Sequence, residues 1–103
     1  MNEELRIKKF DLNQKIVDAI ICFAKKFNLS KVILFGSRAR CDNRPRSDID
    51  LAVIGGDFLE FKFAMNEELP TLLEVDVINL SDKLNSDFLA EIERDGVILY
   101  EKV

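Results

Sequence analysis

The sequence predicts an α/β (α+β) fold, a small mixed β-sheet flanked by helices, and three observations lead to this class. Short apolar runs typical of strands alternate along the chain with segments whose apolar residues recur at helical spacing. Hydrophobic residues make up 48% of the chain, and eight Phe are among them, so a real core can form. The length of 103 residues allows one compact domain, and we expect a single domain over residues 1–103.

The first helix is predicted over residues 11–27. Asp11, with Gln14 three residues further on, resembles a capping box, and Asn28 suits the left-handed position that ends a helix. We also expect Cys22 in the core. The apolar residues that recur at helical spacing are Ile16, Ile20, Phe23, Ala24 and Phe27.

Two further helices are predicted towards the C-terminus. Asp57 and Glu60 form a second capping-box pattern, before a helix that continues to about Leu69. Its predicted core residues are Phe58, Phe61, Ala64, Met65 and Leu69. Phe63 falls outside this stripe and is expected at the surface. Ser86–Arg94 is predicted as a short helix, with Phe88, Leu89 and Ile92 directed inward.

Four short apolar runs predict the strands of the sheet. They are Lys31–Phe35, Asp48–Ile54, Glu74–Leu80 and Val97–Tyr100. After the first strand, Ser37–Arg40 is long enough for one helical turn, and Cys41–Ser47 is a polar loop.

Composition excludes several kinds of chemistry. The chain has no His, which rules out Ser-His-Asp triads, Cys-His dyads and H-E-x-x-H zinc sites. Its two cysteines cannot make a four-ligand zinc site without His, and we expect them to be free thiols. The net charge of −4 argues against binding of long nucleic acid. Because no apolar run approaches the ~20 residues that a bilayer needs, we expect a cytoplasmic protein without a membrane span.

Gly36 and Ser37 follow directly after a predicted buried strand and precede a possible helical turn. Backbone N–H groups at such a junction can hold an anion, and the Ser hydroxyl adds a donor. Taken alone, this pair is more often a plain turn.

Asp48 and Asp50 are two residues apart on a predicted strand. Their carboxylates therefore project from the same face, and they repel each other unless a cation lies between them. Oxygen ligands favour Mg²⁺, Mn²⁺ or Ca²⁺. A solvated start of an edge strand is the alternative for this pair alone.

Asp76 lies between two valines in an otherwise apolar strand. If it is buried, its carboxylate must be paired, protonated or bound to a metal, because an isolated buried charge costs several kcal/mol. It could equally point outward from a half-exposed strand, beside Glu74. The sequence leaves both readings open.

Four of the six arginines, Arg38, Arg40, Arg44 and Arg46, lie between Gly36-Ser37 and the Asp pair. A basic loop beside two acids is suited to a metal-chelated polyphosphate, because the Arg fork matches phosphate oxygens. The alternative is that these arginines balance nearby acids on a solvated loop.

Together these features resemble the minimal nucleotidyltransferase family of the DNA polymerase β-like superfamily. The resemblance rests on the run GSRAR…SDIDLAVIGG, on the strand LLEVDVINL with Asp76, and on the ending IERDGVILYE. It covers the chain from about residue 12 to its end, and it implies the polymerase β-like nucleotidyltransferase fold.

The resemblance implies an Mg²⁺-dependent transfer of AMP from ATP to a hydroxyl. By this likeness, Gly36 and Ser37 hold the terminal phosphates, Asp48 and Asp50 ligate two Mg²⁺ ions, and Asp76 completes one metal site near the attacking hydroxyl. For the nucleotide we add three arginines of the basic loop, Arg38, Arg40 and Arg46.

Small members of the family are typically encoded beside a helical HEPN-type protein, in pairs that resemble a toxin and its antitoxin. The resemblance therefore implies a HEPN-type partner whose Tyr hydroxyl receives AMP. One alternative is a non-catalytic antitoxin that binds its partner only, and another is transfer to a small molecule such as an aminoglycoside. A homodimer is a further expectation for the assembly.

One residue departs from the family pattern. Cys41 stands where the family usually has Gly, at the end of the short turn after Ser37. A non-Gly residue there must avoid the left-handed conformation or accept strain of ~1 kcal/mol or more.

Overall fold

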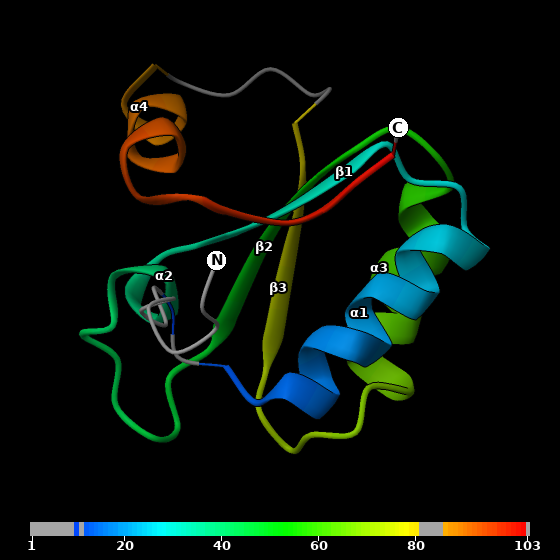
Figure 1. Cartoon of the computed structure of the whole chain (residues 1–103), viewed down its shortest axis with the longest axis horizontal. Coiled ribbons are helices and arrows are strands. Elements are labelled where there is room, and N and C mark those ends of the chain that lie inside the picture. The colour runs from blue at the N-terminus through cyan, green and yellow to red at the C-terminus, as the bar shows by residue number, and fades with distance from the viewer. Residues whose placement is uncertain (1–9, 11, 81–85, 103) are drawn as a thin grey trace, which may run out of the picture.

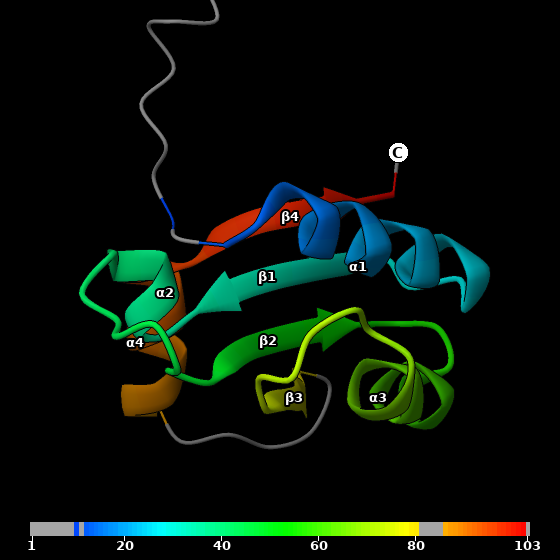
Figure 2. The same cartoon turned by 90° about the horizontal axis from the view of Figure 1, so that it is seen from below.

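The computed structural model describes residues 10, 12–80 and 86–102. In this part of the chain a four-stranded mixed sheet carries helices on both faces (Figures 1 and 2). In chain order the elements are α1 (Gln14–Lys26), β1 (Lys31–Phe35), α2 (Ser37–Arg40), β2 (Ile49–Ile54), α3 (Phe58–Glu67), β3 (Val75–Asn79), α4 (Ser86–Asp95) and β4 (Val97–Glu101). The predicted fold class is confirmed, and β1 and α2 have the predicted bounds.

The strand order across the sheet is β3-β2-β1-β4. β1 is antiparallel to both of its neighbours, β2 and β4, whereas β2 and β3 run parallel. The parallel pair needs a crossover, which α3 provides. As a result β2 and β3 begin at the same end of the sheet, where β1 finishes.

The main core lies between the sheet and the helices α1 and α3. Alternation along the strands sends Val32 and Leu34 of β1 and Leu51 of β2 into this core, where all three are fully buried. The opposite face is covered in part by α4, whose Ile92 packs with Phe35 and Ala52. The sheet therefore has one face devoted to packing and another face that is partly free for polar groups.

The helix ends agree only in part with the predicted caps. Asn13, not Asp11, caps α1, since its side chain accepts a hydrogen bond of 2.7 Å from the Lys15 N–H. The predicted Asp11–Gln14 capping box is wrong, and Asp11 itself lies outside the described residues. Asn28 has the expected positive φ, 60°. At α3 the predicted N-cap is confirmed, because the Asp57 carboxylate accepts a hydrogen bond from the Glu60 N–H. The Asp57 N–H, which a full capping box pairs with the Glu60 side chain, donates to the Phe27 carbonyl instead.

Several burial predictions are confirmed and two are wrong. Phe61 is buried and Phe63 exposed on α3, as expected, and Ile92 is buried. Leu89 is exposed instead of inward, and the side chain of Phe88 lies outside the described part. Cys22 is exposed, and both cysteines are free.

The position of Cys22 follows from the periodicity of α1. The buried stripe consists of Ile16, Val17, Ile20 and Ala24. At 100° per residue, position 22 lies about 200° from Ile20, on the opposite side of the helix.

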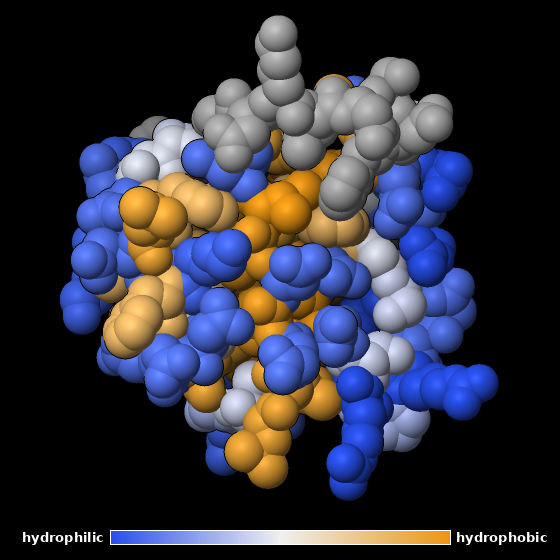
Figure 3. Space-filling view, turned by 180° about the vertical axis from the view of Figure 1, so that it is seen from behind, coloured by the Kyte–Doolittle hydropathy of each residue, from blue (hydrophilic) through white to orange (hydrophobic). Residues whose placement is uncertain are grey.

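A few large apolar side chains remain at the surface, chiefly Leu59 and Phe63 of α3 and Leu72 of the loop before β3. The face behind the view of Figure 1 shows such apolar groups among hydrophilic ones (Figure 3). Within the described ranges, none of the helices combines the length and apolar content that a bilayer span requires.

Candidate active site

The end of β1 and the start of β2 meet at Gly36. Gly36 has a φ of 78°, and a side chain at this position would collide with the carboxylate of Asp50. Its partner in the motif, Ser37, begins α2 and is half-buried. The glycine is therefore required twice, by its backbone conformation and by the close approach of the Asp50 carboxylate.

Three carboxylates lie on the sheet face that α1 and α3 leave free. In the parallel pair β2–β3, Asp50 is directly opposite Asp76, and Asp48 precedes Asp50 by two residues, on the same face. The residues between them, such as Ile49, point into the main core and are buried. Asp48 and Asp76 are exposed and Asp50 is half-buried. The outward orientation of Asp76, one of the two open readings, is the one observed.

Asp50 has the most perturbed carboxyl group of this cluster. Burial, together with the negative charges of Asp76, Asp48 and Glu91, raises the pKa of Asp50 to about 6, while the positive charge of Arg40 opposes this shift. The protein thus holds Asp50 in a position where its negative charge is unfavourable. A bound cation would relieve this repulsion.

We expect Asp50→Asn to stabilise the protein without metal above pH 6. A carboxyl whose pKa is raised by folding binds more protons in the folded state, so the folded state loses stability as pH rises from about 4 to 6. Because Asp50 is only half-buried and solvent screens its charge, we expect Asp50→Asn to raise the free energy of unfolding by about 1 kcal/mol at pH 7.5. Urea unfolding of both proteins in EDTA, at pH 4 and at pH 7.5, checks this.

The two proteins should be equally stable at pH 4. A loss of stability in Asp50→Asn at pH 7.5 would instead mean that the Asp50 carboxylate is a structural anchor.

The donor set fits a hard divalent cation. All three candidates are carboxylates, the oxygen ligands that Mg²⁺ prefers. Among the described residues, no three His, Cys, Asp or Glu side chains are already arranged to hold one ion. This open arrangement suits Mg²⁺ in a nucleotide site, because one or two carboxylates hold it while phosphate and water oxygens complete its shell.

The predicted nucleotide-binding arginines have different environments. Arg40 joins α2 to α4, with its guanidinium 3.1 Å from Asp42, 3.7 Å from Glu91 and 3.8 Å from Asp95. It lies close enough to Asp50 to lower the pKa of that group. Arg46 is exposed and lines a cavity beside Asp48. Arg40 and Arg46 therefore both lie at the edges of the carboxylate cluster.

Arg38, by contrast, is buried and contacts the backbone of the loop 41–47. It is only 5% exposed, and its guanidinium donates hydrogen bonds of 3.1 Å to the Ser47 carbonyl and 3.0 Å to the Pro45 carbonyl. These contacts fasten the loop 41–47 against α2 just before Asp48. This placement speaks against the predicted contact between Arg38 and a nucleotide.

We expect Arg38→Met to lower the free energy of unfolding by about 2 kcal/mol, because two loop carbonyls lose their charged donor. Arg44→Met, an exposed position in the same loop, is the matched control and should change stability by less than about 0.5 kcal/mol. Chemical denaturation of the three proteins measures this. Equal stabilities would show that the Arg38 contacts do not hold the loop.

Cys41 adopts the left-handed conformation, with φ 63° and ψ 27°, at the end of α2. The sequence left two outcomes open for Cys41, avoidance of the left-handed conformation or strain in it, and the structure shows the strained conformation. The turn thus keeps a conformation that glycine would adopt more easily, at a cost of about 1 kcal/mol.

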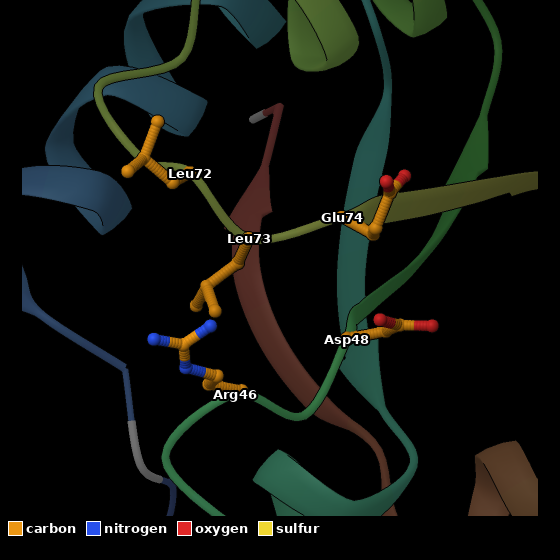
Figure 4. A pocket seen from close by; sticks show the side chains of 5 residues that line it. All are labelled: Arg46, Asp48, Leu72, Leu73 and Glu74. Carbon is orange, nitrogen blue, oxygen red and sulfur yellow. The ribbon is translucent and has the colours of Figure 1, made fainter.

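Sequence reasoning did not select Glu74 or Glu91. The Ile49 N–H donates a 2.9 Å hydrogen bond to the Glu74 carbonyl, so Glu74 lies beside Asp48 just as Asp76 lies beside Asp50. Figure 4 shows the Asp48 and Glu74 side chains directed to the same side. The spacing of two residues between Glu74 and Asp76 places both on the same face of the strand, so the sequence could have indicated Glu74. No local pattern indicates Glu91, which lies on α4 and acts on Asp50 from there.

Comparisons with known proteins identify the family of the chain. Residues 7–103 match the family model described as polymerase beta, nucleotidyltransferase. A protein of Methanocaldococcus jannaschii, named as a candidate protein adenylyltransferase, is 31% identical over 97% of this chain and 100% of its own length.

Solved structures share the fold. A toxin–antitoxin structure with AMP-PNP superposes with a TM-score of 0.67 at 22% identity, covering 84% of this chain and 73% of that one. A structure of the toxin–antitoxin pair MntA–HepT superposes with a TM-score of 0.64 at 21% identity, covering 87% of this chain and 74% of that one. At these identities the likeness concerns the fold.

Proposed function

Because the chain belongs to the polymerase β nucleotidyltransferase family, and is thus an enzyme, we propose that it transfers AMP from ATP to a hydroxyl of a partner protein. The observation that carries this proposal is the placement of Asp48, Asp50 and Asp76 on one free sheet face, with Gly36 against the Asp50 carboxylate. The adenylyltransferase name of the relative supports AMP as the transferred group.

The proposed step is a displacement at the α-phosphorus of ATP. The acceptor oxygen forms a bond to this phosphorus, the bond to the oxygen that bridges to the β-phosphate breaks, and pyrophosphate leaves with the electron pair. The exposed carboxylate of Asp76 takes the hydroxyl proton. Mg²⁺ held by Asp48, Asp50 and Asp76, two ions in the full site, would supply positive charge for the phosphate oxygens.

The strand order supports a direction for this displacement. The Gly36-Ser37 pair follows β1, Asp50 is on β2 and Asp76 is on β3, and these strands are neighbours in this order. An in-line displacement needs its entering and leaving oxygens on opposite sides of the phosphorus. We therefore assign pyrophosphate to the β1 side and the acceptor hydroxyl to the β3 side.

For the partner we propose a helical HEPN-type protein encoded nearby, which offers a Tyr hydroxyl and forms a toxin–antitoxin pair with this chain. Support comes from the solved toxin–antitoxin structures that share the fold. The net charge of −4 suits a basic partner, because opposite charges accelerate association.

The test is an incubation of the purified chain with ATP labelled at the α-phosphate, Mg²⁺ and the purified partner. Label should appear on the partner, be lost when its acceptor Tyr is changed to Phe, and be lost with Asp76→Asn, which should still bind ATP. If label reached only a small molecule, the proposal would be wrong. It would also be wrong if a triple Asp→Asn variant silenced the partner as well as the parent chain does.

A further inference from the structure

The outer side of α3 carries two large apolar side chains that the described structure leaves uncovered. Leu59 is 75% exposed and Phe63 is 59% exposed, whereas Phe61 between them is buried. Because they are four residues apart, Leu59 and Phe63 are neighbours on one side of the helix. At about 100° per residue, each lies about 160° around the helix from Phe61, so both project almost directly away from the core. We call this pair the α3 ridge.

The α3 ridge and the carboxylate cluster belong to opposite sides of the sheet. α3 packs against β3 and α1 (Figure 2), and the three candidate carboxylates lie on the sheet face that these helices leave free. On the face behind the view of Figure 1, apolar side chains project between hydrophilic ones on the side where α3 lies (Figure 3). A protein bound to the ridge therefore leaves the carboxylate cluster open to ATP.

The two flanks of the ridge differ in charge. Glu60 and Glu67 are exposed on one flank, about 10 Å apart along the helix, and neither forms an ion pair with a described residue. On the other flank the Lys62 ammonium lies 5.9 Å from the centroid of the Phe58 ring. The Asn66 amide on this flank donates a 2.9 Å hydrogen bond to the Lys62 carbonyl. The acidic flank is therefore the one that offers charge to a partner.

The charge around the ridge indicates which occupant fits. Residues 57–68 contain four acidic residues and one basic residue, a net charge of −3, and all five are exposed. This segment repels a nucleic acid or an anionic lipid surface. A second copy of the chain would bring the same excess of negative charge against itself. The surface that complements the ridge is apolar with a basic margin.

We propose that the α3 ridge is the docking surface for a basic amphipathic helix of the partner protein. Leu59 and Phe63 fit between apolar side chains of the partner helix, since residues four apart form the ridges by which packed helices interdigitate. Lys or Arg residues about seven positions apart on that helix face Glu60 and Glu67. This inference rests on the proposed function for the existence of a partner, and it adds the surface that holds this partner.

The first test measures the affinity of the purified partner for the chain by calorimetric titration without ATP. Phe63→Ser should weaken binding at least about tenfold, because a few large side chains carry most of the binding energy of an interface. Ile98→Ser is the matched control. Ile98 is 52% exposed but lies on β4, at the opposite edge of the sheet from β3, and its variant should stay within about twofold of the parent. Circular dichroism checks that both variants are folded.

A charge reversal tests the acidic flank separately. Glu67→Lys should weaken binding about fivefold at low salt, and the loss should shrink as salt is added, because salt screens exposed charges. Glu93→Lys is the matched control, since Glu93 is an exposed residue near the end of α4, on the other face of the sheet. It should keep the affinity of the parent.

The outcomes separate this inference from the proposed function. Equal affinity of Phe63→Ser and the parent overturns the inference, and so does equal affinity of the two Lys variants. It is also overturned if sedimentation of the chain alone shows a dimer that Phe63→Ser dissociates, because the ridge would then bind a second copy. Absence of binding between the parent and the partner overturns it as well. Binding that depends on the ridge but leads to no AMP on the partner contradicts the proposed transfer and leaves this inference standing.

Discussion

We expect Asp50→Asn to lower AMP transfer about 10³-fold or more, while the protein stays folded. Asp50 is the half-buried member of the cluster, lies against Gly36 and faces Asp76 across the parallel pair. An amide there keeps the shape but removes the charge that, in the proposed site, would hold Mg²⁺ against the phosphate oxygens. A loss of 10³-fold corresponds to about 4 kcal/mol of transition-state stabilisation, which is within what a metal site supplies.

The measurement is the initial rate of label transfer from ATP to the partner, with circular dichroism as the check of folding. The transfer rate of Asp48→Asn should also fall. Asp18→Asn is the matched control, since Asp18 is an exposed carboxylate on α1, and it should keep the parent rate. If Asp50→Asn kept more than about a tenth of the parent rate, the carboxylate would have no catalytic role.

We expect removal of divalent metal to weaken ATP binding at least about tenfold. Without a cation, the triphosphate meets the charges of Asp48, Asp50 and Asp76, with Glu74 close by and Glu91 approaching from α4. Arg40 offers little compensation, because three carboxylates already surround its guanidinium. Mg²⁺ or Mn²⁺ held by the carboxylates would convert this repulsion into attraction.

Calorimetric titration with a non-hydrolysable ATP analogue, in Mg²⁺ and in EDTA, measures the effect. The Asp50→Asn variant is the internal control, and its affinity should depend less on the metal than that of the parent. Equal affinity of the parent chain in Mg²⁺ and in EDTA would contradict a metal-bridged site.

Local patterns were sufficient for most of the secondary structure. β1 was predicted to the residue because an apolar run without polar interruption, closed by Gly36, leaves little choice of boundary. The N-cap of α1 was harder to predict, since Asp11 and Asn13 are both good N-cap residues and lie two positions apart. Asn13 forms the observed cap.

The arginines show where sequence reasoning fails at the site. Four arginines within nine positions look equivalent in sequence. In the fold, Arg38 is buried and donates hydrogen bonds to two loop carbonyls, Arg40 forms an ion pair with Glu91 of α4, and Arg46 is exposed at the cavity beside Asp48. The difference arises because burial of a guanidinium depends on which loop backbone closes over it, and the order of residues does not show this.

The sequence by itself determined the residue types of the site and their local geometry. The Gly36-Ser37 junction, the Asp48–Asp50 spacing and the lone Asp76 follow from strand periodicity, which acts over two or three residues. Only the tertiary structure decided that Asp50 faces Asp76, that Glu74 lies beside Asp48 and that Glu91 reaches the cluster. The parallel register of β2 and β3 and the docking of α4 bring these groups together, because they join segments about 25 to 40 positions apart whose packing no local pattern encodes.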